Sequence, residues 1–186
     1  MNYLEIAGTI VGVLYLWLEY RASAWLWLAS IVMPALYIGV YYQAGLYADL
    51  GISIYYIIAS VYGAVCWLRG HGARENNGRI SYTPKRIVVP LMCISATIFI
   101  VIGYILSRYT DSTVPWADAF TTALSIVAMW MLARKYLEQW LVWIAADVAC
   151  AVLYAYKGLW FTGGLYLAYT VIAVFGFRKW KVLMNE

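Results

Sequence analysis

Asp147 stands near the middle of the apolar run WLVWIAADVACAVLY, which covers residues 140–154. A carboxylate at the centre of a membrane-spanning helix costs roughly 2.5–3.5 kcal/mol on insertion scales, and such residues normally face a bundle interior or a cavity. No lysine or arginine lies at a comparable depth in any apolar run, so a cationic ligand is the expected partner. The alternative is a protonated Asp147 that is hydrogen-bonded to a neighbouring helix.

Aromatic side chains share a helix face with this carboxylate. Steps of three and four residues place Trp140, Trp143, Cys150 and Tyr154 on the face of Asp147. Indole and phenol rings attract cations by about 0.5–2 kcal/mol, and they also stack on flat rings. The spacing therefore predicts a site for a small, flat, cationic ligand.

Polar and aromatic residues recur at the same spacing in the third and the last apolar runs of the chain. Interfacial anchoring or packing is the alternative for any single tyrosine or tryptophan, and it suits those near the ends of the runs best. The predicted ligand contacts outside the Asp147 run are Tyr37, Tyr41, Tyr56, Ser60, Ser125, Tyr166 and Tyr169.

The composition places these residues in a membrane. Of the 186 residues, 65% are apolar and 12% are charged, and the mean hydropathy is +0.74. A soluble domain of this size does not need that much hydrocarbon, so we expect an all-α integral membrane protein. The cysteines lie in apolar runs and the lone histidine lies in a polar loop, so we expect no metal, no cofactor and no enzyme active site. No basic segment of a cleavable signal peptide precedes the first run.

Seven apolar runs are long enough to cross a hydrocarbon core of about 30 Å, which takes roughly 20 helical residues. The basic residues between the runs divide eleven to two between the two sides, which predicts an outer N-terminus and a cytoplasmic C-terminus. They explain the net charge of +4 without a nucleic-acid partner. The expected membrane spans cover residues 3–20, 24–42, 46–68, 87–107, 116–133, 138–156 and 159–178.

An internal repeat organises these spans. Residues 5–67 align without a gap on residues 118–180, at an offset of 113, so that tryptophans, tyrosines and glycines coincide. The single span at 87–107 restores the orientation, and the two repeats are therefore parallel, as in transporters whose site lies between the halves. The expected 3+1+3 organisation has a first repeat at 1–69, a cytoplasmic loop at 70–86, a linker helix at 87–107, a second repeat at 116–180 and a cytoplasmic tail at 181–186.

Pro34 is the repeat mate of Asp147, and a proline inside a helix permits a kink. Gly12 is small enough to let two helices approach closely or rock against each other, although packing alone also explains it. We therefore interpret Pro34 and Gly12 as gating positions.

Four carboxylates fall near the outer side of the membrane, those of Glu5, Asp49, Asp111 and Asp118, and we expect Glu5, Asp49 and Asp118 to line an outer vestibule. An acidic outer vestibule would concentrate cations, whereas ordinary interfacial charges are the alternative for each residue singly. Glu19 lies at the inner end of the first span, where a salt bridge with Arg21 is the expected interaction.

Four segments resemble the Pnu family of bacterial vitamin transporters. They are DAFTTALSIVAMW (118–130), RKYLEQWLVW (134–143), LYAYKGLW (153–160) and YQAGLYAD (42–49), and the resemblance covers nearly the whole chain. It implies a SWEET-like fold of three, one and three helices in the bacterial inner membrane. It also implies facilitated diffusion of nicotinamide riboside, thiamine, riboflavin or deoxynucleosides, followed by phosphorylation by an intracellular kinase.

We therefore predict a uniporter for a small cationic vitamin. Thiamine is slightly favoured over nicotinamide riboside, because the resemblance implies an amide after the tryptophan in carriers of the riboside, where this chain has Asp147 four residues after Trp143. The alternatives are a SWEET-like carrier of a neutral nucleoside, riboflavin or sugar, and a receptor that binds without transport. A homo-oligomer such as a trimer is a further expectation. A retinal protein is excluded, because the span at 159–178 contains no lysine.

Overall fold

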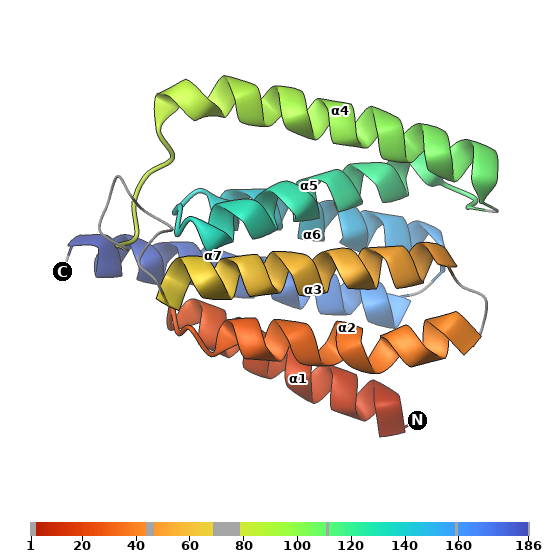
Figure 1. Ribbon diagram of the computed structural model, residues 1–186, viewed down its shortest axis with the longest axis horizontal. Coiled ribbons are helices and arrows are strands. Elements are labelled where there is room, and N and C mark those ends of the chain that lie inside the picture. Colours follow the sequence, from red (N-terminus) through yellow and green to blue (C-terminus); the bar gives the residue numbers. More distant parts are fainter. Residues whose placement is uncertain (1–2, 44–46, 69–78, 111, 159, 186) are drawn as a thin grey trace. The chain divides into compact units, whose positions relative to one another are not determined.

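The computed structural model describes the backbone of residues 3–43, 47–68, 79–110, 112–158 and 160–185 (Figure 1). Side chains are described for all residues in these ranges except 3–10, 33, 36, 37, 40, 41, 43, 47–50, 52, 161 and 162. The described residues form seven α-helices, which confirms the predicted all-helical class. The chain divides into two compact units, Met1–Arg79 and Ile80–Glu186.

The first unit contains α1 (Tyr3–Tyr20), α2 (Leu26–Gln43) and α3 (Tyr47–Leu68). Helix α2 packs against both α1 and α3. Pro34 lies inside α2, where it removes one backbone N–H from the helix and permits a bend. These three helices agree closely with the spans expected at 3–20, 24–42 and 46–68.

The second unit contains α4 (Lys85–Tyr109), α5 (Pro115–Ala133), α6 (Gln139–Tyr156) and α7 (Trp160–Asn185). Each of these helices packs against the next one along the chain. Helix α7 continues well beyond the span expected at 159–178, because the apolar pattern marks the depth of the membrane and not the end of the helix.

Three helices within the described part of the chain are long and apolar enough to cross a membrane, namely α4, α5 and α6. Shorter apolar helical segments cover Val11–Tyr20 and Ser53–Leu68 in the first unit. In the other four helices some side chains are not described, so the full set of seven membrane spans stays a prediction. Only 6% of the most apolar stretch of α4 is buried, so its apolar side chains are largely uncovered by the described part of the chain.

One tryptophan–glycine contact occurs in both units, at positions 113 residues apart. The ring of Trp27 covers Gly63 in the first unit, and the ring of Trp140 covers Gly176 in the second. A Cβ atom at Gly176 would lie 2.6 Å from the Trp140 ring, so only glycine allows the helices this approach. Each ring also meets a second tryptophan edge-on, with both pairs of ring centres 5.7 Å apart: Trp27 with Trp67, and Trp140 with Trp180.

The turn between α1 and α2 recurs between α5 and α6, at the same offset of 113 residues. Ala22 and Lys135 both have positive φ angles, of 50° and 55°. The residue before each of them places its guanidinium over a tryptophan ring four residues earlier, at 4.9 Å for Arg21 and 5.4 Å for Arg134. The helix contacts and the turn therefore match in geometry as well as in sequence.

The segment that leads into α4 is attached to the turn between α5 and α6. The Ser81 N–H donates to the Lys135 carbonyl at 3.1 Å, and the Leu137 N–H donates to the Ser81 carbonyl at 2.9 Å. The Thr83 N–H and hydroxyl both donate to Glu138 Oε2, at 2.8 and 2.7 Å. The described C-terminal part of the loop expected at 70–86 is thus held by four hydrogen bonds.

Candidate functional site

Asp147 lies in the middle of α6, and only 8% of it is exposed. It lies within electrostatic range of Cys150 on the same helix and of Tyr166 and Tyr169 on α7. Among the described residues, none donates a hydrogen bond to this carboxylate or forms an ion pair with it. The alternative of a structural hydrogen bond to a neighbouring helix therefore finds no partner in this part of the chain.

Three tyrosines form a continuous aromatic wall beside Asp147. Tyr154 of α6 stacks on Tyr166 of α7, with ring centres 5.3 Å apart and ring planes at 9°. Tyr169 meets Tyr166 edge-on, at 5.7 Å and 75°. All three are predicted contacts, and all three belong to the second unit. Their flat faces can stack on a ring, and their hydroxyl groups can orient it.

The two predicted tryptophan contacts of α6 differ in their surroundings. Trp140 is 1% exposed, and its ring packs against Gly176 and Trp180, which gives it a structural role in the contact between α6 and α7. Trp143 lies one helical turn before Asp147, and its buried indole N–H has no hydrogen-bond partner among the described residues. The buried indole N–H of Trp140 has no described partner either. An unpaired buried donor is costly, and because the Trp140 ring is held between Gly176 and Trp180, Trp143 is the better placed of the two to donate to a ligand.

Asp118 lies in the first turn of α5, and its carboxylate is already engaged. Lys157 Nζ lies 3.2 Å from Asp118 Oδ1, and the Ser112 hydroxyl donates to Oδ2 at 2.7 Å. Lys157 Nζ also lies 5.9 Å from the centre of the Tyr154 ring. The expected vestibule carboxylate is therefore compensated by a cation that stands at the end of the tyrosine wall.

The predicted serine contacts have local partners. The Ser125 hydroxyl donates to the Thr121 carbonyl of its own helix at 2.9 Å. The Ser60 hydroxyl donates to the Tyr56 carbonyl at 2.6 Å and accepts from the Ser30 hydroxyl at 2.8 Å. Both groups are satisfied without a ligand, and Ser60 joins α2 to α3.

The remaining predicted residues of the first unit are only partly described. Tyr56 is half-buried on α3, with its ring 5.6 Å from that of Tyr55. Gly12 and Pro34 are half-buried in α1 and α2. The predicted side chains of Glu5, Tyr37, Tyr41 and Asp49 lie outside the described ones.

Glu19 is a second buried carboxylate, which the sequence analysis did not place in a site. It is 1% exposed, and Tyr15, one turn earlier on α1, is hydrogen-bonded to it. The expected salt bridge with Arg21 is not formed, because the Arg21 guanidinium lies over Trp17. The spacing of Tyr15 and Glu19 on one helix face was the available signal for this pair.

The apolar helices, the carboxylate inside one of them and the aromatic wall beside it define a multi-pass membrane protein of the transporter class. The chain belongs to the nicotinamide mononucleotide transporter family, whose family model matches residues 2–182. This match confirms the resemblance to the Pnu transporters.

Individual relatives match nearly the whole chain at low identity. The nicotinamide riboside transporter PnuC of Escherichia coli is 26% identical, with 97% of this chain and 85% of the relative covered. The riboflavin/roseoflavin transporter RibM of Streptomyces davaonensis is 25% identical, with 95% and 83% covered. A crystal structure of the vitamin B3 transporter PnuC has the same fold, with a TM-score of 0.74, 22% identity, and 98% of this chain and 82% of that chain covered.

Proposed function

We propose that this protein carries a small pyridinium nucleoside, of the nicotinamide riboside type, across the bacterial inner membrane. The observation that carries the proposal is Asp147, which is buried in α6 with no described hydrogen-bond or ion-pair partner beside three tyrosines. A pyridinium ring supplies both a positive charge for the carboxylate and a flat face for the aromatic wall. The buried N–H of Trp143 provides a donor for the amide or the ribose.

The choice between cationic vitamins rests on the relatives. Those described above are named for nicotinamide riboside, vitamin B3 and riboflavin, so the preference for thiamine drawn from the sequence finds no support. Riboflavin is the second candidate, because one relative is named for it, but its neutral ring would leave the Asp147 charge without a counterion.

The proposed mechanism is facilitated diffusion. A cation that moves into a negative interior gains about 2.3 kcal/mol per 100 mV, so no coupling ion is required. An intracellular kinase would then retain the product by phosphorylation. The proposed organisation is that of the sequence analysis: two parallel three-helix repeats joined by α4, with the N-terminus outside and the C-terminus in the cytoplasm.

Binding titrations on the purified protein test the substrate class. Nicotinamide riboside should bind, and reduced nicotinamide riboside, whose dihydropyridine ring is neutral, should bind far more weakly. Thiamine and riboflavin are measured under the same conditions. Tight binding of riboflavin without binding of either cation would refute the electrostatic argument. Liposomes with a trapped kinase then test uniport, which requires uptake without a sodium or proton gradient.

A further inference from the structure

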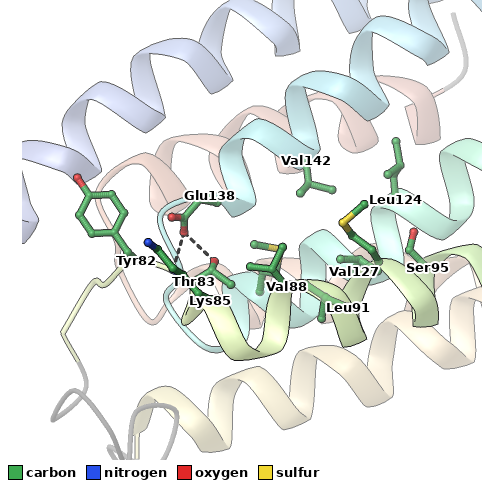
Figure 2. A pocket seen from close by; sticks show the side chains of 12 residues that line it. Tyr82, Thr83, Lys85, Val88, Leu91, Ser95, Leu124, Val127, Glu138 and Val142 are labelled. Carbon is green, nitrogen blue, oxygen red and sulfur yellow. Dashed lines mark hydrogen bonds between the residues drawn. The ribbon is translucent and has the colours of Figure 1, made fainter.

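A cavity of about 560 Å³ lies in the second unit between α4, α5 and the start of α6 (Figure 2). It is separate from the residues around Asp147, none of which lines it. Its wall is apolar over most of its length. The principal wall residues are Val88, Leu91 and Met92 of α4, and Leu124, Val127 and Met131 of α5.

The depth of this cavity corresponds to one leaflet of a bilayer. It extends along α4 from Lys85 to Ser95, and ten residues of α-helix rise about 15 Å. That length is half of a hydrocarbon core of about 30 Å. Because α4 and α5 are both candidate membrane spans, the apolar wall lies where acyl chains lie, and its length suits one such chain.

Two opposite charges stand at the rim of the cavity. Lys85 is exposed and forms no ion pair with Glu138 or with any other described residue. Glu138 is half-buried, and both hydrogen bonds to its carboxylate from described residues end on Oε2, which leaves Oε1 for a further donor. The rim therefore offers a cation and an anion that do not neutralise each other by direct contact.

We propose that this cavity binds an aminophospholipid of the phosphatidylethanolamine type, with one acyl chain between α4 and α5. The lipid phosphate pairs with Lys85, and its ammonium group donates to Glu138. An anionic lipid such as phosphatidylglycerol matches only half of this rim, because it has no ammonium group and meets the Glu138 carboxylate. The zwitterionic headgroup satisfies both charges.

Photolabelling of the full chain in nanodiscs tests the site. The probe is phosphatidylethanolamine with a diazirine on one acyl chain, and the labelled residues are mapped by mass spectrometry. Label should concentrate on residues 88–95 and 124–131. Unlabelled phosphatidylethanolamine should compete for these positions about tenfold better than phosphatidylglycerol, the difference expected for one hydrogen bond between charged groups.

Two neighbouring valines supply a matched pair of variants. Val88→Trp fills the cavity and should abolish labelling of residues 124–131. Val89 is more exposed and does not line the cavity, so Val89→Trp should leave this labelling unchanged. Glu138→Gln should leave the acyl chain bound but remove the preference over phosphatidylglycerol. Label spread evenly over all helices, equal competition by the two lipids, or a Val88→Trp protein that labels normally would overturn the proposal. Labelling of a second copy of the chain in place of these segments would assign the cavity to a protein interface instead.

Discussion

The ammonium group of Lys157 lies 3.2 Å from Asp118 Oδ1, which ties the turn after α6 to the first turn of α5. The same group lies 5.9 Å from the centre of the Tyr154 ring, whose other neighbour is the stacked ring of Tyr166. A cation of the protein thus stands at the Tyr154 end of the aromatic wall. A cationic ligand that approaches from this side meets a compensated carboxylate and a positive charge of like sign.

Replacement of Lys157 should therefore speed the association of a cationic ligand. Lys157→Gln removes the opposing charge and exposes Asp118, so the association rate of nicotinamide riboside should rise, most of all at low salt, where screening is weakest. The unfolding free energy should change by less than about 1 kcal/mol, because the ion pair is exposed. Stopped-flow tryptophan fluorescence measures the rate, and an unchanged rate at low salt would contradict this assignment.

Replacement of Asp147 should show whether ligand binding depends on the charge of this side chain or on its size. Asp147→Asn keeps the size of the side chain but removes its charge, so binding of nicotinamide riboside should weaken on the order of 100-fold or more, as expected for a broken buried pair worth about 3–5 kcal/mol. Reduced nicotinamide riboside should bind the variant as well as it binds the original protein. Thermal stability should be unchanged or higher, because a carboxylate without a described partner is removed.

The conservative variant Asp147→Glu provides the control for charge and should retain part of the binding. If Asp147→Asn binds the cation normally, or if it fails to fold, the carboxylate has a structural role. The site would then have to be built on the tyrosines alone.

Replacement of Gly176 should destabilise the second unit. A methyl group in Gly176→Ala would lie 2.6 Å from the buried Trp140 ring and should cost about 1–3 kcal/mol through overpacking. Gly164→Ala lies on the same helix with nothing within 4 Å of the new carbon, and should be stabilising by roughly 0.5–1 kcal/mol. Thermal unfolding in detergent compares the two variants. Equal midpoints would show that the Trp140 ring can move aside.

Replacement of Glu138 should release the segment that leads into α4. Glu138→Ala leaves the Thr83 N–H and hydroxyl without their acceptor, which should cost about 1–3 kcal/mol locally. Hydrogen exchange of residues 81–83 should accelerate, whereas exchange in α6 and α7 should not. Thr97→Val serves as the control, because that hydroxyl is exposed and bonds only within its own helix. Unchanged protection at residue 83 would show that the backbone bonds of Ser81 suffice.

The sequence by itself determined the class of the protein and the extent of most helices. Apolar runs of spanning length leave the backbone no alternative to helix in a membrane, which is why the expected spans at 3–20 and 116–133 nearly coincide with α1 and α5. The offset of 113 residues also predicted which tryptophans and glycines correspond. The spacing of the aromatic residues around the single carboxylate of α6 predicted which side chains share its helix face.

The tertiary structure decided which of these residues are free to act. Trp140 and Trp143 share a face of α6, and the indole N–H of each is buried without a described partner, but only packing against α7 shows that the ring of Trp140 lies against Gly176 and Trp180. Sequence spacing specifies the direction of a side chain on its own helix, whereas its partner is set by the angle and separation of a second helix. The pairing of Asp118 with Lys157, the hold of Glu138 on Thr83 and the cavity beside α4 all arise from such contacts between helices.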